Sequence, residues 1–268
     1  MNYETLLYDV TDEIATITLN RPARLNAYSA TMGREIVGAV REAEQDRAVR
    51  VLILTGAGDR AFCAGADLAG FASNIKEREH GNAAREERGG GMLAFPGMMQ
   101  ALSKPSIVAI NGYALGVGAT MTLPCDIRIA SENAKIGFIF PRVGVAPELG
   151  STFLLPRLIG AARAAEMFLT GRHYSAHDCL AMGLVSQVTA SGDLIAKAHE
   201  LANEIIQGSP TSLALTRRGL YLGLNSSLES AMEFELFALE RCYASPEHKE
   251  YVTAFMEKRK PDLSRIKR

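Results

Sequence analysis

Two glycine-rich turns place backbone N–H groups where they could do chemistry. Ala64-Gly-Ala-Asp-Leu68 comes after the apolar run of residues 51–54, and Asn111-Gly-Tyr-Ala-Leu-Gly-Val-Gly118 comes after the run of residues 106–110. Small residues let a ligand approach the backbone, and N–H groups at the start of a helix favour developing negative charge. Two such turns on adjacent strands could direct two N–H donors at one oxygen, the geometry of an oxyanion hole. Each turn could equally be needed only for packing.

A second pattern, Gly56-Ala-Gly-Asp-Arg-Ala61, matches the glycine fingerprint of dinucleotide-binding proteins. That fingerprint requires a helix that begins at the glycines. Residues 62–67, which follow it, contain another glycine and are typical of a loop. A nicotinamide site is therefore disfavoured.

His173 and His177 are four residues apart, a spacing that could place two imidazoles on one helix face for a metal ion. Ser175 and Asp178, however, form the pattern of a capping box, which begins the helix after His173. No third ligand lies nearby in the sequence. We therefore expect no metal site and no cofactor in this protein.

The composition is typical of a globular protein, with 47% hydrophobic and 22% charged residues in a chain of 268. The 29 basic and 30 acidic residues leave a net charge of −1, which argues against nucleic-acid binding because that binding needs surplus Lys and Arg. The four cysteines are far apart, and the N-terminus lacks the pattern of a secretory signal. No apolar run reaches the roughly 18 residues that span a bilayer. These features predict a cytoplasmic protein with no membrane partner.

The elements that must position the two turns alternate between strand and helix. A hairpin is predicted for residues 4–10 and 13–19, around a turn at Thr11-Asp12. Ser29 is the predicted N-cap of a helix that runs to about Asp46. Further strands are predicted for residues 51–54, 106–110 and 125–130. This alternation is typical of an α/β fold with parallel pairing.

After about residue 193 the pattern is helical only. Helices are predicted for residues 196–206, 210–222, 227–243 and 246–258. We therefore expect an α/β core over residues 1–192 and a helical region over residues 193–268. The charged stretch 76–91, which ends in three glycines, is predicted to be a mobile surface segment.

Four motifs in the right order together resemble the crotonase (enoyl-CoA hydratase/isomerase) superfamily. They are Asn20-Arg-Pro-Ala-Arg-Leu-Asn-Ala27, Ala61-Phe-Cys-Ala-Gly-Ala-Asp-Leu68, Asn111-Gly-Tyr-Ala-Leu-Gly-Val-Gly118 and Phe255-Met-Glu-Lys-Arg-Lys260. The resemblance runs from about residue 5 to about residue 262. It implies a spiral of ββα units followed by helices that build homotrimers, often paired into hexamers. It also implies an acyl-CoA thioester as the substrate.

The same resemblance implies an oxyanion hole. In this superfamily two backbone N–H groups hold the thioester carbonyl and stabilise an enolate, and by position these belong to Ala66 and Val117. The family often has glycine at the second position, but the donor is backbone, so Val117 can supply it while its side chain narrows the site.

Contacts with coenzyme A are implied at eight further positions: Arg24, Ala64, Asp67, Leu68, Ala69, Phe140, Phe255 and Lys258. Arg24 matches a basic residue near the nucleotide end of the coenzyme, and residues 67–69 match the path of the pantetheine arm. Phe255 and Lys258 match residues that reach the coenzyme of a neighbouring subunit. The apolar residues of the stretch 71–99, among them Met92, Phe95 and Met98, are expected to shape the acyl pocket.

The chain departs from the hydratases at both of their glutamates, which are replaced by Thr120 and Phe140. A different acid, Glu148, stands in Val145-Ala-Pro-Glu-Leu-Gly-Ser-Thr152, which is similar to a segment of enoyl-CoA isomerases. One base suits an allylic isomerisation, in which it takes the α-proton of a 3-enoyl-CoA and returns it at Cγ. Apolar neighbours, for which Phe140, Leu149 and Phe153 are candidates, would raise the pKa of this acid.

Three alternatives stay open. Glu148 could be a cap or first-turn acid of a helix that begins at Leu149. The chain could be a hydratase that uses Glu148 with another acid or an ordered water. It could also be a non-catalytic member of the fold that binds acyl-CoA or RNA, although the near-neutral charge disfavours RNA.

Overall fold

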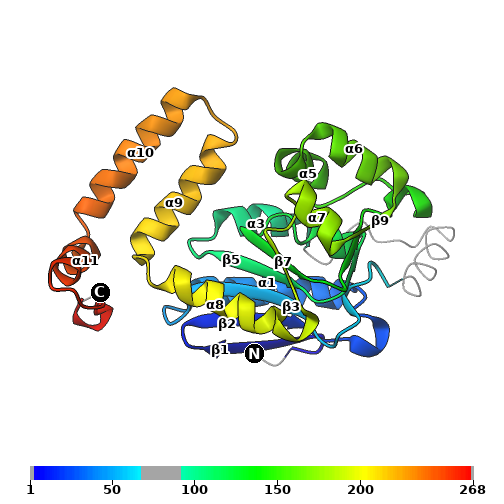
Figure 1. Ribbon diagram of the computed structural model, residues 1–268, viewed down its shortest axis with the longest axis horizontal. Helices are drawn as coiled ribbons and strands as arrows, with labels where there is room; N and C mark the ends of the chain where they lie inside the picture. The colour runs from blue at the N-terminus through cyan, green and yellow to red at the C-terminus, as the bar shows by residue number, and fades with distance from the viewer. Residues whose placement is uncertain (1–2, 68–91, 267–268) are drawn as a thin grey trace.

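Two β-sheets form the frame of the computed structural model, which describes residues 3–67 and 92–266 (Figure 1). The larger sheet has the order β1 (Leu6–Thr11), β2 (Ile14–Leu19), β3 (Val51–Gly56), β5 (Ser106–Ile110), β7 (Ile127–Ser131), β10 (Gln187–Thr189). The smaller sheet has the order β4 (Ala61–Cys63), β6 (Tyr113–Leu115), β8 (Lys135–Gly137), β9 (His173–Ser175). Neighbouring strands are parallel except in the pairs β1–β2 and β8–β9.

Consecutive strands alternate between the two sheets. β3, β5 and β7 lie in the larger sheet, and β4, β6 and β8, which follow them in turn, lie in the smaller one. Each pair of strands leads to a helix. The helices are α1 (Ala30–Gln45), α3 (Phe95–Ala101), α4 (Val117–Thr120), α5 (Ser151–Ile159), α6 (Ala161–Thr170), α7 (Ala176–Met182), α8 (Leu194–Ile206), α9 (Pro210–Gly223), α10 (Leu228–Tyr243) and α11 (Pro246–Met256). This winding confirms the predicted α/β spiral of ββα units.

β3 shows why the core strands are apolar throughout. Side chains alternate between the faces of a strand, and all of β3 is buried. Leu52 and Leu54 pack into the main core between the sheets and α1, whereas Val51 and Ile53 face α8. Buried on both faces, such a strand is expected to lack an alternating polar pattern.

Most predicted elements are confirmed with small shifts at their ends. The Ser29 side chain accepts a hydrogen bond from the Met32 N–H, as expected of the N-cap of α1. The hairpin turn lies at Asp12 and Glu13, both with positive φ, one residue later than predicted. The strand predicted from residue 125 begins at Ile127, because the Cys125 N–H donates into the preceding turn. The stretch 76–91 lies outside the described residues.

Beyond α8, the helices α9, α10 and α11 form an arm that extends away from the sheets (Figure 1). The division of the chain at residue 193 stays a prediction, since α8 itself packs on the larger sheet. None of the described helices is both long enough and apolar enough to cross a membrane.

Arg217 joins this arm to the core. Its buried guanidinium pairs with the Asp126 carboxylate (2.8 Å) and donates to the Leu102 carbonyl (2.5 Å) and to two other carbonyls at the end of α3. The Tyr221 hydroxyl donates to the second oxygen of Asp126 (2.6 Å). A buried ion pair with these hydrogen bonds holds α9 against α3 and the start of β7.

We expect Arg217→Ala to lower the free energy of unfolding by about 3–5 kcal/mol, because it removes the ion-pair partner of a part-buried carboxylate and the side-chain donor of three carbonyls. Chemical denaturation measures the loss. The matched control is Arg218→Ala, since Arg218 is exposed and lies over the Phe234 ring at 5.5 Å; it should cost less than about 1 kcal/mol. Equal losses in the two variants would contradict the role given to Arg217.

Candidate active site

Ala66 lies in an extended segment that pairs with Tyr28. The Tyr28 N–H donates to the Gly65 carbonyl (2.8 Å), and the Asp67 N–H donates to the Tyr28 carbonyl (2.9 Å). In a parallel bridge the two flanking residues make these bonds, so the N–H of Ala66 itself points to the other side of the segment. Within residues 3–67 and 92–266 the Ala66 N–H has no backbone acceptor.

Val117 is the first residue of α4. Gly116 precedes it with a positive φ of 53° and donates its own N–H to the Gly137 carbonyl (2.9 Å). The first N–H groups of a helix have no partner inside it. In the described part of the chain the Val117 N–H likewise has no backbone acceptor. Both predicted oxyanion-hole donors are therefore available to a ligand.

The two turns touch through their backbones. A Cβ atom on Gly118 would lie 2.1 Å from the Cys63 carbonyl oxygen, and one on Gly65 would lie 3.3 Å from the Leu115 carbonyl oxygen. The strands that bring them together are β4 and β6, which pair in parallel. Sequence reasoning placed the turns after the strands of residues 51–54 and 106–110 and missed these short strands. Three residues carry too little periodicity to be recognised.

The Asn20–Ala27 motif makes hydrogen bonds that hold the segment before the first turn in place. Asn26 is fully buried, and its side-chain amide donates to the carbonyls of Ala57 (2.9 Å) and Ala61 (2.8 Å). Its oxygen accepts from the Arg21 N–H (2.9 Å). The two bonds from the amide tie the loop before α1 to residues 57–61, which lead to Ala66, and the third holds the loop itself together.

Arg24 and Asp67, two of the predicted coenzyme-contact residues, lie close together. The Asp67 carboxylate pairs with Arg21 at 2.9 Å and with Arg24 at 3.9 Å. Arg21 was not predicted as a site residue, although it belongs to the same motif. The Arg24 side chain is 62% exposed, so its guanidinium can still contact an anionic ligand.

Glu148 stands two residues before the N-cap of α5. The N-cap is Gly150, with no side-chain hydrogen bond at the cap, and the helix begins at Ser151. The interpretation of Glu148 as a cap is therefore wrong. Between Glu148 and the N-cap, Leu149 has a φ of 51°, a left-handed conformation that costs a leucine roughly 1–2 kcal/mol. Such strain next to a polar side chain is common at functional sites.

The carboxyl group of Glu148 lies beside α4 and the first turn. Loss of hydration among surrounding protein atoms raises the pKa of Glu148 even though the residue keeps open surface, and a hydrogen bond with the Thr120 side chain lowers it. Burial raises the pKa of the Tyr28 phenol and raises that of the Cys63 thiol to about 11, and the nearby Glu148 charge adds to both. The Glu148 charge thus acts on Tyr28, which pairs with Ala66, and on Cys63 in the strand before the first turn.

The candidate apolar neighbours of Glu148 occupy different environments. Phe140 and Leu149 are buried in the main core. Phe153 is 41% exposed, and the Arg157 guanidinium lies 3.4 Å above its ring. One face of the Phe153 ring is therefore in a cation–π contact with Arg157 at the protein surface.

Of the remaining coenzyme candidates, Leu68 and Ala69 lie outside the described residues. Ala64 donates its N–H to the Leu25 carbonyl (3.0 Å) in the first turn. Phe255 and Lys258 lie in and just after α11, and Phe255 is 83% exposed. Figure 1 shows α11 at the far end of the arm from α5, so these residues lie away from their own chain's candidate site.

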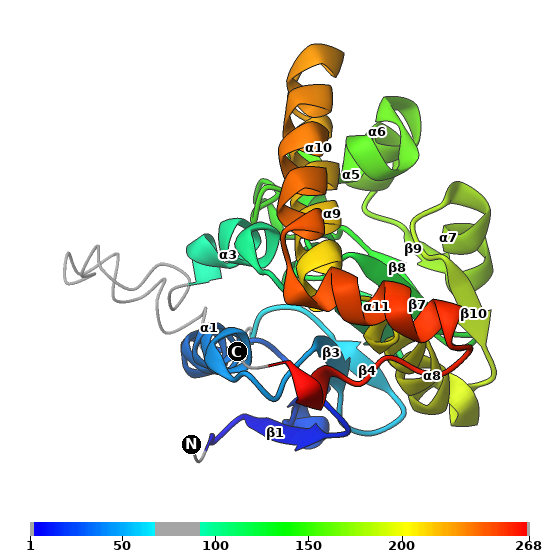
Figure 2. The same cartoon turned by 90° about the vertical axis from the view of Figure 1, so that its left-hand side faces the viewer.

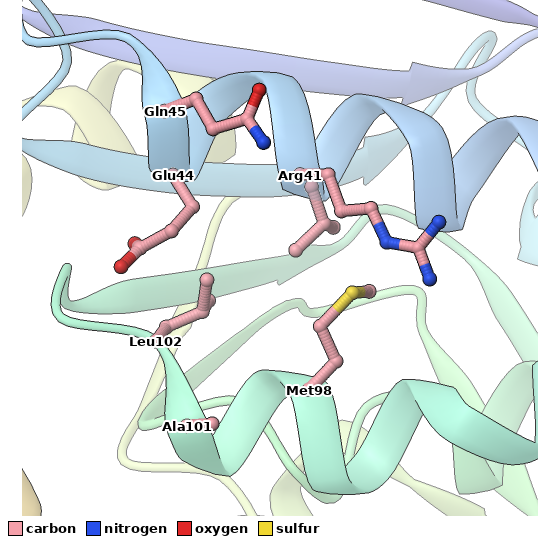
Figure 3. Close-up of a pocket in the computed structure, with 7 residues that line it drawn as sticks. Arg41, Glu44, Gln45, Met98, Ala101 and Leu102 are labelled. Atoms are coloured by element: carbon pink, nitrogen blue, oxygen red, sulfur yellow. The ribbon is translucent and has the colours of Figure 1, made fainter.

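The residues expected to shape the acyl pocket lie in part elsewhere. Met92 and Phe95 are buried in the main core. Met98 lines a cavity of about 150 Å³ between α1 and α3, together with Arg41 and Glu44 (Figure 3). Ligand pockets for molecules of drug size have about 300–1,000 Å³, so this cavity is too small for a coenzyme A thioester.

The weaker motifs have structural roles. Gly56 ends β3 and Ala61 begins β4, so the fingerprint joins two strands. His173 lies in β9, and Ser175 and Asp178 form the capping box of α7 as predicted. Across the described ranges, no group of three or more His, Cys, Asp or Glu side chains is arranged to hold a metal ion.

Comparison with known proteins gives one consistent result. The family model for enoyl-CoA hydratase/isomerase matches residues 9–265. The chain is 35% identical to the short-chain-enoyl-CoA hydratase of Clostridium acetobutylicum over 262 residues, 97% of each chain. It is also 35% identical to the crotonyl-CoA hydratase of Syntrophomonas wolfei over 98% of this chain and 99% of that one. A solved enoyl-CoA hydratase from Bacillus anthracis matches with a TM-score of 0.89 and 34% identity, over 97% of this chain and 98% of that chain.

We expect Gly118→Ala to destabilise the protein by about 1–3 kcal/mol and to weaken thioester binding, because the new methyl group collides with the Cys63 carbonyl and displaces the Val117 N–H. Thermal melting and calorimetric binding of an acyl-CoA measure the two effects. Gly97→Ala is the matched control, since Gly97 lies in helix α3 with nothing within 4 Å of an added Cβ. It should raise stability by up to about 1 kcal/mol. If Gly118→Ala behaves like the control, the close contact is not required.

Proposed function

The chain belongs to the enoyl-CoA hydratase/isomerase family, and from this membership and its site we propose that it shifts the double bond of an enoyl-CoA, with Glu148 carrying the proton. The proposal is supported by the lack of a second acid beside Glu148 among the described residues. Among the described residues, no second carboxylate contributes to its pKa, and Thr120 and Phe140 stand where hydratases of the family have glutamates. One carboxylate is enough to move a proton along an acyl chain.

In the proposed reaction the N–H groups of Ala66 and Val117 bind the thioester oxygen. The Glu148 carboxylate removes the α-proton of a 3-enoyl-CoA, and the two N–H groups stabilise the resulting dienolate. Glu148, now protonated, returns the proton at Cγ and leaves a 2-enoyl-CoA. The reaction as drawn needs no metal ion and no redox cofactor.

The raised pKa of Glu148 suits both steps. A carboxyl group whose pKa lies nearer to neutrality is a stronger base and is still able to return the proton. Proton removal requires the ionised form. We therefore expect kcat/KM to fall as the pH is lowered through this raised pKa.

The coenzyme would lie along the first turn. Arg24, exposed beside Asp67, is proposed to contact the phosphates of its nucleotide end, and residues 67–69 with Ala64 and Phe140 to line the path to the site. Phe255 and Lys258 would contact the coenzyme bound to a neighbouring subunit. The four cysteines are free thiols, three of them buried, which supports a reducing compartment such as the cytoplasm.

A second candidate function is hydration of a 2-enoyl-CoA. The relatives reported above are named hydratases, and those names favour this alternative over isomerisation. In that case Glu148 would activate water together with another acid or an ordered water molecule. A non-catalytic acyl-CoA-binding protein is the third candidate.

A direct test is to offer crotonyl-CoA and a 3-enoyl-CoA separately. We expect faster conversion of the 3-enoyl-CoA to the conjugated 2-enoyl-CoA, and Glu148→Gln should lower kcat on the order of 10²–10⁴-fold while acyl-CoA binding is retained. Glu200→Gln on α8 is the control, because Glu200 is exposed and pairs only with Lys197 among the described ion pairs.

Each of the other outcomes supports one of the two alternative functions. Faster formation of the 3-hydroxy product from crotonyl-CoA would establish the hydratase. Tight acyl-CoA binding with no turnover of either thioester would establish the binding protein.

We also propose that the chain forms a homotrimer or a hexamer through its arm. Figures 1 and 2 show α10 extending beyond the core with α9 behind it. The large apolar side chains exposed on these two helices are Leu220, Leu222, Leu224, Leu228, Met232, Leu236, Phe237, Leu239 and Tyr243. This many exposed large apolar side chains on two paired helices support a protein interface there.

We expect Leu236→Asp to reduce the mass in solution towards that of one chain, because a carboxylate would be buried in the subunit contact. Light scattering coupled to gel filtration measures the mass. Leu169→Asp, at a leucine that is 79% exposed on α6, is the control and should leave the mass unchanged. A wild-type protein that elutes as a single chain would contradict the proposal.

A further inference from the structure

Arg21 makes two side-chain contacts, one on each side of the β-bridge that contains Ala66. Its guanidinium donates to the Ala27 carbonyl at 2.6 Å and to the Asp67 carboxylate at 2.9 Å. The first acceptor precedes Tyr28 in the sequence and the second follows Ala66, the two residues that form the bridge. The guanidinium therefore links the two segments that the bridge brings together.

The bridge itself is short. It consists of one residue pair outside the named strands, and two backbone hydrogen bonds of 2.8 Å and 2.9 Å join Tyr28 to Gly65 and Asp67. The N–H of Ala66 points to the other side of its segment. Its direction therefore depends on how firmly the whole segment is held.

The backbone of Arg21 is fixed on its own loop. Its N–H donates to the Asn26 side chain (2.9 Å), and its carbonyl accepts from the N–H groups of Arg24 (2.9 Å) and Asn26 (3.0 Å). The side chains of Arg21 and Asp67 are only 21% and 20% exposed, so their ion pair is screened less than one in open solvent. A planar guanidinium that donates in two fixed directions is suited to holding two segments at a constant distance.

Arg24 differs from Arg21, although both pair with the same carboxylate. Arg24 lies 3.9 Å from the Asp67 carboxylate, and its side chain is 62% exposed. Arg24 can therefore turn to the phosphates of a coenzyme while Arg21 keeps the carboxylate in place.

We propose that Arg21 is a positioning residue for the oxyanion hole, because it holds the segment of Ala66 at the angle that directs the Ala66 N–H at a thioester oxygen. This role rests on the proposed function, in which Ala66 is one of the two donors. A donor of an oxyanion hole contributes on the order of 10²–10³-fold to kcat, provided that it is aligned with the oxygen. Arg21 acts on the substrate only through Ala66.

The test is Arg21→Met, which keeps the apolar part of the side chain and removes the guanidinium. We expect kcat for a 3-enoyl-CoA to fall on the order of 10–100-fold, with a smaller change in KM, because the N–H loses its alignment while most of the coenzyme contacts remain. Arg21→Lys should lie between the wild type and Arg21→Met, since an ammonium group does not reproduce the two directed bonds of a guanidinium.

Arg50→Met is the matched control. The Arg50 guanidinium also donates to a carbonyl, that of Gly208 at 2.6 Å, and also pairs with a carboxylate, that of Glu13 at 3.9 Å. These partners lie between α8 and α9 and in the turn between β1 and β2, outside both glycine-rich turns. The variant therefore removes a similar pair of contacts away from the candidate site.

A second readout reports on the donor without turnover. Infrared spectroscopy of bound butyryl-CoA, labelled with carbon-13 at the thioester carbonyl, detects hydrogen bonds to that oxygen, and the saturated chain has no double bond to shift. We expect the carbonyl band of the wild-type complex to lie at lower frequency than that of free butyryl-CoA. In Arg21→Met, at saturating butyryl-CoA, the band should move back towards the free value, whereas Arg50→Met should retain the wild-type frequency.

The band separates the role of Arg21 from the proposed function. An unchanged wild-type frequency in Arg21→Met, or an equal displacement in Arg50→Met, overturns the role of Arg21 even if the enzyme isomerises enoyl-CoA. A displacement confined to Arg21→Met supports it, and in a protein that turns over no enoyl-CoA the same result contradicts only the proposed function. A wild-type complex with no shifted band overturns both the role of Arg21 and the oxyanion hole. If Arg21→Met does not fold, as judged by thermal melting, Arg21→Lys must show a displacement in the same direction.

Discussion

The close approach of two backbone turns is the constraint on which the candidate site depends. Gly118 lies so near the Cys63 carbonyl that any side chain at this position would have to displace the backbone. This contact brings together the two turns that carry Ala66 and Val117, the predicted oxyanion-hole donors. Three further contacts hold the two turns in this position. They are the pairing of β4 with β6, the β-bridge between Tyr28 and Ala66, and the hydrogen bonds of the Asn26 side chain.

The proposed acid is coupled to this framework through α4. Thr120, whose side chain lowers the pKa of Glu148, and Val117 lie in one helical turn, so α4 carries residues that bear on both the proposed acid and the predicted oxyanion hole. The turn that follows α4 is also held in place, because the buried Arg128 guanidinium donates to the carbonyls of Leu123 (3.3 Å) and Cys125 (2.5 Å). Pre-organised dipoles of this kind stabilise developing charge without reorganising during the reaction.

The helical arm, α9 to α11, connects the candidate active site with the proposed assembly of subunits. Arg217 and Tyr221 connect α9 with Asp126 at the start of β7, while the apolar faces of α9 and α10 stay exposed in the single chain. Phe255 is exposed at the far end of the arm, away from its own site. In the proposed oligomer one subunit would then supply residues to the coenzyme bound by its neighbour.

The sequence by itself determined the alternation of strands and helices, the helices after residue 193, the N-cap at Ser29 and the two glycine-rich turns, while the spiral and the two N–H donors were implied by the family resemblance. These depend on local periodicity and on glycine, which are visible along the chain. The tertiary structure alone showed that β4 and β6 unite the turns, that Arg21 pairs with Asp67, and that Glu148 lies before the N-cap of α5 instead of capping it. Ala61 and its partner Tyr113, like Arg21 and Asp67, are far apart in the sequence and lie on short or irregular segments without a periodic pattern. Only the packing of the whole chain can bring them together.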